Sequence, residues 1–294
     1  MTAMTQVAIP TARDRFAAAR TAWRSVLTHV QPETEAQPRL AVAADLARRL
    51  DATLIGVAAE MIPPEGLSDP YGLMPGGFVQ ALTEAIQDNL RHAQTAFDTA
   101  SAGLKRQWMG LQDQPSAAIE RLARGADLIV AGGSPLEDRD TCRWCDPAEL
   151  VIKAGRPVLV APPAGGVLAA EAVVVAWKDS RESRRALADA MPLLAGAEQV
   201  MIVETTTESD IEALEAHHDA LLAHLLRHGV IAQSRVLPAK PTETALVLQA
   251  QRRELGADLI VSGAYGHTRF GEWVFGGVTA DLMADPQAFV LFSH

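Results

Sequence analysis

The chain has 294 residues, 48% of them hydrophobic, and a formal net charge of −10. This acidic balance argues against nucleic acid as a partner, because binding to phosphates requires clustered Lys and Arg. No apolar run reaches the roughly 18 residues that a membrane span needs, and the first residues lack the apolar core of a signal peptide. The two cysteines, Cys142 and Cys145, cannot form a disulfide framework. We therefore expect a soluble, cytoplasmic protein with no membrane partner.

The first half of the chain alternates short β-branched runs with helical patterns. Such alternation is typical of βαβ units and a parallel sheet. The expected strands are 25–30, 53–58, 105–111, 127–131 and 157–161. The expected helices are 38–50, 79–104 and 116–124. Segment 63–77 is rich in Pro and Gly and is expected to form a loop outside the sheet.

The second half repeats this order more clearly. Its strands are continuous apolar runs, which indicates burial on both faces of the sheet. The expected strands are 172–176, 200–203, 230–236, 258–262 and 288–292. The expected helices are 183–194, 211–228 and 242–255, and a further helix is expected to begin near 277–279.

Two segments of the chain are nearly identical. Residues 125–132 read GADLIVAG and residues 256–263 read GADLIVSG, so the offset is 131 residues. A repeat at about half the chain length indicates two copies of one domain. We expect a mobile segment at 1–14, a first domain at 15–162, a short Pro/Gly linker at 163–170 and a second domain at 171–294.

A glycine-rich loop follows the fourth strand of the second half. Residues 263–279 read GAYGHTRFGEWVFGGVT. Glycines let the backbone approach a ligand closely, and successive backbone N–H groups in such turns form a concavity that binds anions. The loop also lies where ligands bind in open α/β sheets, at the carboxyl end of a parallel strand. A glycine-rich surface loop without a ligand explains the same spacing equally well.

The repeat and this loop together resemble the universal stress protein family in a tandem, two-domain form. Nucleotide-binding members of that family carry G-x2-G-x9-G-[ST] after the fourth strand, and Gly263, Gly266 and Gly276 match it. Gly277 stands where Ser or Thr is usual, and Thr279 follows two residues later. The resemblance implies two tandem, doubly wound α/β domains, each a five-stranded, mostly parallel sheet of the adenine nucleotide alpha hydrolase-like type.

The resemblance also implies the ligand, which is an adenine nucleotide. ATP is the expected species, with ADP or AMP as alternatives, and Mg²⁺ would accompany ATP. The phosphates would lie against the glycine backbone and the segment Gly277, Val278 and Thr279. His267 and Arg269 would contact a phosphate or remain exposed loop residues.

The end of the first strand departs from the family pattern. Family members usually carry a V-[DN]-G-S-like turn there, whereas this chain has Ala176, Trp177, Lys178 and Asp179. Lys178 holds the usual position of the acid. Asp179 could accept the hydrogen bonds instead, Lys178 could reach a phosphate, and Trp177 could stack on a base or fill space. Val203, at the end of the next strand, completes the expected binding residues.

The first half lacks the phosphate loop. Pro135 follows its fourth strand closely and cannot donate an N–H. Glu137, Asp138 and Asp140 would repel an anion. We expect one nucleotide site per chain, in the second domain.

Two other clusters offer alternatives. Cys142 and Cys145 form a C-x2-C pair, which can hold half a zinc site or close a redox disulfide, or can be two reduced thiols in a surface loop. Three further residues, His217, His224 and His228, fall on one stripe of a predicted helix, where His224 and His228 could grip a metal. A solvated flank is the preferred reading, and we assign no metal ligand.

Three functions follow from these patterns. The first is a stress-response protein regulated by nucleotide binding. The second is a pseudo-dimeric interaction protein without a ligand, whose domains pair through their fifth strands, 158–160 and 289–291. The third is a redox or metal protein using the cysteine pair. The resemblance allows slow ATP hydrolysis, but no nucleophile and base stand together, so we assign no catalytic residue. A homodimer with twofold symmetry is expected.

Overall fold

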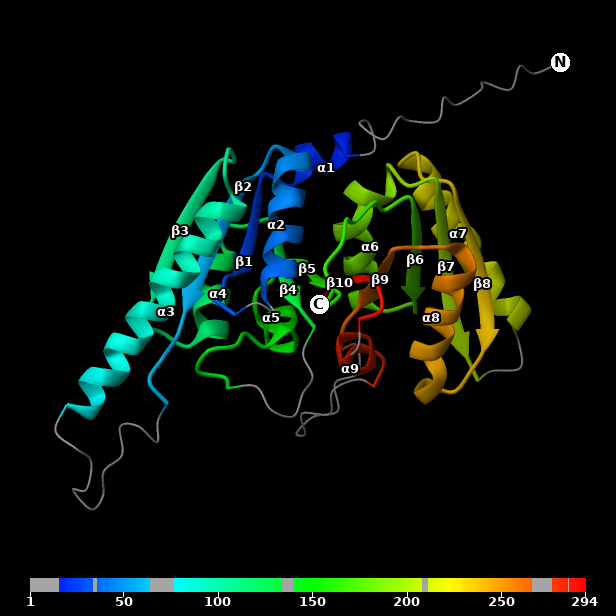
Figure 1. Cartoon of the computed structure of the whole chain (residues 1–294). Helices are drawn as coiled ribbons and strands as arrows, with labels where there is room; N and C mark the ends of the chain where they lie inside the picture. The colour runs from blue at the N-terminus through cyan, green and yellow to red at the C-terminus, as the bar shows by residue number, and fades with distance from the viewer. Residues whose placement is uncertain are drawn as a thin grey trace.

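The computed structural model describes residues 16–33, 36–63, 77–133, 140–207, 211–265, 277–284 and 286–294. Within these ranges the strands form one ten-stranded sheet in the order β3-β2-β1-β4-β5-β10-β9-β6-β7-β8. Figure 1 shows the two halves side by side, with the C-terminus at their junction. The expected mobile segment 1–14 and most of the expected loop 63–77 lie outside the described residues.

Each half contributes five strands. The first-half strands are β1 (Ser25–His29), β2 (Thr53–Ala59), β3 (Arg106–Leu111), β4 (Leu128–Gly132) and β5 (Val158–Ala161). The second-half strands are β6 (Ala172–Trp177), β7 (Gln199–Thr206), β8 (Ala232–Pro238), β9 (Leu259–Gly263) and β10 (Phe289–Ser293). Within each half all neighbouring strands are parallel. The tandem, mostly parallel α/β fold expected from the sequence is confirmed.

Helices cover both faces of the sheet. The first-half helices are α1 (Ala17–Ala22), α2 (Gln37–Leu50), α3 (Phe78–Ala100), α4 (Pro115–Ala123) and α5 (Pro147–Lys153). The second-half helices are α6 (Arg181–Leu194), α7 (Ile211–Arg227), the short η3 (Pro241–Glu243), α8 (Thr244–Leu255) and α9 (Gly277–Ala284). One apolar cluster lies under α1, α2, α3, α6 and α7, and the other under α4, α5, α8 and α9. The sequence pattern predicts neither α1 nor α5, which are both short.

The strand order creates a topological switch point in each half. In the first half β1 lies between β2 and β4, and in the second half β6 lies between β7 and β9. From each central strand the chain continues to opposite sides of the sheet. The neighbouring strands β1 and β4, and likewise β6 and β9, therefore each mark a topological switch point. Ligands bind outside the carboxyl ends of the strands at such points. The fold therefore offers two equivalent positions, one per half.

The two halves join through β5 and β10. These strands pair antiparallel, with Leu159 opposite Leu291 and Val160 opposite Val290. All four side chains are buried. Gly133, after β4, packs against the turn before β10, where an added Cβ would lie 2.6 Å from Pro286 Cγ. Both apolar clusters contain residues of both halves, so the core runs through the junction.

The repeated motif has a structural role in each half. The Asp127 carboxylate accepts hydrogen bonds from the Arg24 and Ser25 N–H groups at 2.8 and 3.0 Å. The carboxylate of Asp258 accepts them from the N–H groups of Ala169 and Ala170, at 2.5 and 3.1 Å to Oδ2. Each aspartate thus fixes the chain just before the first strand of its half. The repeated Asp is explained by folding rather than by ligand binding.

In the part of the chain that the structure describes, we find no helix long and apolar enough to cross a membrane.

Candidate functional site

The predicted site of the second half lies at the carboxyl ends of β6, β7 and β9. Ala176, near the end of β6, lies beside Val203 of β7 on one side and beside Ser262 of β9 on the other. Ala176 and Val203 pack on the face covered by α8 and α9. In Figure 1, α9 lies at the edge of the sheet to which the arrows of β6 and β8 point. The structure therefore brings these predicted residues together at the second switch point.

Trp177 lies on the other face of the sheet. Its side chain is half-buried and packs against the apolar cluster under α6 and α7. This placement separates the indole from the Ala176 and Val203 face. The structure thus fits the space-filling interpretation of Trp177 better than stacking on a base.

Lys178 and Asp179 lie in the turn between β6 and α6. Both are exposed, and the Asp179 carboxylate forms an ion pair with Arg184, one turn into α6. The cap of α6 is Ser180, whose hydroxyl accepts a hydrogen bond from the Ser183 N–H at 3.2 Å. Asp179 is therefore free of the capping role and remains at the rim of the crevice.

Gly263 ends β9 directly beneath the start of α6. An added Cβ would lie 2.6 Å from both the carbonyl carbon of Glu182 and the nitrogen of Ser183. Real Cβ atoms do not approach backbone so closely, because a packed interior has no room to relax. Gly263 is thus required by packing, whatever the loop beyond it binds.

Helix α9 begins without an acid. Gly277, its first residue, is exposed, and an added Cβ would meet nothing within 4 Å. Thr279 is buried and Val278 half-buried. The first turn contains no acidic residue. Since the first N–H groups of a helix attract anions, this end of α9 suits a phosphate. Gly266, His267, Arg269 and Gly276 lie outside the described residues.

The first half fills the equivalent positions with its own side chains. Asp146 caps the start of helix α5, and its carboxylate accepts a hydrogen bond from the Ala148 N–H at 2.9 Å. This carboxylate takes the place that an external anion would have at the helix start. The first half therefore satisfies the N-terminus of α5 internally.

Arg39 closes the first switch point. Its guanidinium donates to the His29 carbonyl at 2.9 Å and to Gln31 Oε1 at 2.8 Å. An added Cβ on Gly132, at the end of β4, would lie 3.0 Å from Arg39 Nη1. Gly132 is the repeat equivalent of Gly263, which meets Ser183 in the second half. The Arg39 side chain thus covers the end of β4, whereas the backbone at the start of α6 covers the end of β9.

His29 occupies a further equivalent position. It lies three residues after Val26, which pairs with Leu128, whereas Ala176 lies three residues after Val173, which pairs with Leu259. The imidazole is buried. Burial, together with the charge of Arg39, lowers the pKa of His29 to about 3. A neutral ring therefore fills space that the small Ala176 side chain leaves in the second half.

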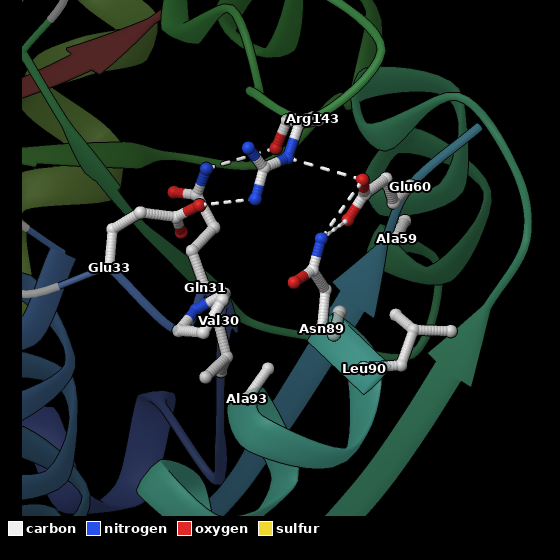
Figure 2. A pocket seen from close by; sticks show the side chains of 11 residues that line it. Val30, Gln31, Glu33, Ala59, Glu60, Asn89, Leu90, Ala93 and Arg143 are labelled. Atoms are coloured by element: carbon white, nitrogen blue, oxygen red, sulfur yellow. Dashed lines mark hydrogen bonds and ion pairs between the residues drawn. The ribbon is translucent and has the colours of Figure 1, made fainter. Parts of the chain in front are cut away.

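A polar cleft lies across the sheet in the first half. It lies between the ends of β1 and β2, the helix α3 and the loop before α5. Figure 2 shows the Arg143 guanidinium between two carboxylates. The ion pairs are 2.5 Å to Glu33 Oε1 and 3.2 Å to Glu60 Oε1. Asn89 Nδ2 donates to Glu60 at 3.1 Å. Burial raises the pKa of Glu60, with further contributions from the charges of Glu33 and Asp140.

This cleft is unsuited to nucleotide phosphates. Two carboxylates surround one guanidinium, so the cluster of Glu33, Glu60 and Arg143 carries a net negative charge. Gln31 adds an amide that donates to the Arg143 carbonyl at 2.9 Å. The cluster ties the loop before α5 to the ends of β1 and β2. We interpret the cluster as holding that loop against the two strands.

The cysteine pair does not have the setting of a redox site. Burial raises the pKa of Cys145 to about 12, whereas a reactive thiol needs a lowered pKa. Cys142 is buried. Among the described residues, no group of three or more His, Cys, Asp or Glu is placed to hold a metal. These observations weigh against the redox interpretation of Cys142 and Cys145.

Comparisons with known proteins were made by sequence and by structure. No family model matches the chain, and no curated protein matches it. A universal stress protein from Archaeoglobus fulgidus is 13% identical, with a TM-score of 0.63 over 92% of this chain and 95% of its own. Two Pseudomonas aeruginosa structures, one of a functionally unknown protein and one described as a universal stress protein, are each 18% identical, with TM-scores of 0.58 and 94% of both chains covered.

The chain has the fold of a tandem universal stress protein. The matches span nearly the whole of both chains, so the likeness covers both halves. Within this fold, the predicted residues Ala176, Val203 and Gly263 lie on the neighbouring strands β6, β7 and β9, and Trp177 is turned to the opposite face.

Sequence reasoning missed the residues that close the first switch point. Arg39, His29 and Arg143 are polar residues within or beside apolar segments. A charged residue inside the apolar stripe of a helix, as Arg39 is in α2, is the one signal that could have found them. A second missed feature is Tyr265, which follows β9 with a φ of +60°. A left-handed backbone at a bulky residue marks strain beside the loop.

Proposed function

We propose that the chain binds an adenine nucleotide, ATP above all, at the second switch point and acts in stress response by nucleotide-dependent regulation. The contrast between the halves carries this proposal. The first half has a buried His29 and Arg39 at its switch point and the capping Asp146 at α5, whereas the second half has the small Ala176 at the position of His29 and an acid-free start of α9. The second half combines this small side chain at its switch point with the glycine-rich loop.

Each part of the second site has a physical task in this proposal. The base would lie near Ala176 and Val203, on the face shared with α8 and α9. The phosphates would accept N–H groups from the glycine loop and from the first turn of α9. The exposed amine of Lys178 would reach a phosphate, and Mg²⁺ would accompany ATP. ADP or AMP would use the same base and ribose contacts.

Regulation, rather than catalysis, is the activity that we propose. The sequence offers no nucleophile and base standing together, so hydrolysis would be slow at most. Binding would bias the conformation of the glycine loop and so regulate assembly or partner choice. The helix that follows this loop, α9, contacts the first-half helix α5. A cytoplasmic location fits this role.

The first test is the nucleotide content of the purified protein. The protein is denatured and the released small molecules are measured by mass spectrometry, and ATP binding is measured by calorimetry. We expect about one adenine nucleotide per chain. Gly277→Asp places a carboxylate at the first residue of α9 and should abolish binding. The matched control Ala284→Asp, at the exposed end of the same helix, should retain it.

Two results would count against the proposal. One is a protein that contains no nucleotide and shows no thermal shift with excess ATP. The other is a Gly277→Asp variant that binds ATP as tightly as the original chain. Either result would favour the second candidate function.

The second candidate is a ligand-free interaction protein, which the β5–β10 pair favours. The buried strands Val158–Ala161 and Phe289–Ser293 join the halves as a pseudo-dimer. A homodimer of whole chains, which we also propose, would then need another surface, because β5 and β10 are already paired. Light scattering of the purified chain measures this directly. A monomeric mass at all concentrations would remove the homodimer.

A further inference from the structure

An exposed pair of histidines lies at the carboxyl end of α7. His224 and His228 stand one helical turn apart, and both side chains are exposed. Their ring centroids are 4.9 Å apart, with the ring planes at 60°. His228 keeps a turn conformation beyond the helix because its N–H donates to the Leu225 carbonyl at 2.9 Å. Gly229, with a φ of +77°, then ends the helix.

The spacing of these rings suits one shared metal ion. Imidazole nitrogens bind Zn²⁺ at about 2.0–2.1 Å, which places the centres of two rings on one ion about 5 Å apart. The observed separation of His224 and His228 is 4.9 Å. No rearrangement of the backbone is needed, since residues four apart share a helix face. The partial negative charge at the end of a helix also favours a cation there.

We propose that His224 and His228 chelate a divalent transition-metal ion. Imidazole ligands select Cu²⁺, Ni²⁺ and Zn²⁺, with Cu²⁺ bound most tightly, and do not select Mg²⁺ or Ca²⁺. The described residues provide no third His, Cys, Asp or Glu at this place, so water completes the coordination. The ion therefore sits in an open, exchangeable site. This site is separate from the nucleotide crevice.

The other histidines of α7 serve different ends. His218 is buried, and its Nε2 lies 2.7 Å from the Glu204 carboxylate. His217 is exposed, but it lies seven residues before His224, a rise of about 10 Å along the helix. One ion cannot bridge that distance, so His217 provides a matched control for removal of a surface imidazole.

Calorimetric titration with Ni²⁺ tests the pair on the full chain without a tag. We expect one strong equivalent per chain and no heat with Mg²⁺. Replacing either member, His224→Ala or His228→Ala, turns a chelate into a single ligand and should weaken Ni²⁺ binding about a hundredfold. His217→Ala should leave it unchanged. All three side chains are exposed, so the variants are expected to fold, which circular dichroism checks.

Three results would overturn the proposal. The first is the lack of a strong Ni²⁺ equivalent in the original chain. The second is unchanged Ni²⁺ binding in the double variant His224→Ala and His228→Ala. The third is an equal loss in His217→Ala, which would mean that any surface histidine of α7 contributes alike.

Discussion

At the scale of single residues, His29 and Arg39 distinguish the first half from the second. Both are buried at the first switch point, and the Arg39 guanidinium bonds the His29 carbonyl at 2.9 Å. Burial lowers the pKa of His29 to about 3, with Arg39 adding to the effect. The residue is therefore neutral in the folded chain at any pH above that value. In the unfolded chain it titrates near its ordinary pKa of about 6.5.

This difference predicts a loss of stability in acid. Between pH 6.5 and 3 the unfolded chain binds a proton at His29 that the folded chain does not, so the free energy of unfolding falls as the pH falls. The contribution is about 3 kcal/mol between pH 7 and pH 4. His29→Leu removes it. Urea denaturation of both proteins across this range should therefore show that the variant loses less free energy of unfolding than the original chain as the pH drops.

The comparison of the two proteins removes the shared effect of the carboxylates. A difference in unfolding free energy between His29→Leu and the original chain that does not change with pH would contradict the account of His29. Such a result would mean that the imidazole binds its proton equally well in the folded and the unfolded chain.

At the scale of elements, the packing of β9 against α6 decides which substitutions the second switch point can tolerate. Gly263 is the contact point, since its Cβ position lies 2.6 Å from the backbone of Glu182 and Ser183. Gly263→Ala should destabilise the fold by about 1–3 kcal/mol, because the strand and helix must separate. Gly277→Ala, at the open start of α9, should cost nothing. Urea denaturation measures both.

Equal losses of unfolding free energy in Gly263→Ala and Gly277→Ala would contradict the close packing of Gly263 against α6. The pair also distinguishes two physical reasons for a glycine in this part of the chain. Gly263 is required by packing, whereas Gly277 has open space around its Cβ position, where a ligand would lie.

The sequence predicts the strands and long helices better than it predicts the side chains that fill the first switch point. Apolar strands such as Val173–Val175 are buried on both faces, so their pattern is unmistakable. Helix α5 was missed because seven residues carry too little periodicity. The closure of the first crevice was missed for a different reason. Arg39 reaches Gly132 and His29 only after the sheet has formed, and no local pattern encodes such a contact.

One continuous core joins the halves at the scale of the whole molecule. Leu159 and Leu291 face each other across the β5–β10 pair and are buried. We therefore expect the two halves to unfold in one cooperative transition. Hydrogen exchange at rising urea concentration, followed separately in each half, measures this. Leu291→Asp buries an unpaired charge in the junction and should separate the two transitions.

The matched control for this variant is Leu246→Asp, because Leu246 is exposed. It should leave the single transition intact. Two separate transitions in the original chain would contradict a core shared across β5 and β10.

The central claim is that one nucleotide binds at the second switch point and none at the first. Photolabelling with 8-azido-ATP, followed by mass spectrometry of the labelled peptides, tests it most directly. The account predicts labelled peptides from the ends of β6 and β7, around Ala176 and Val203, and their loss when excess ATP competes. Label around His29 at the first switch point, or label anywhere that ATP does not displace, would contradict it.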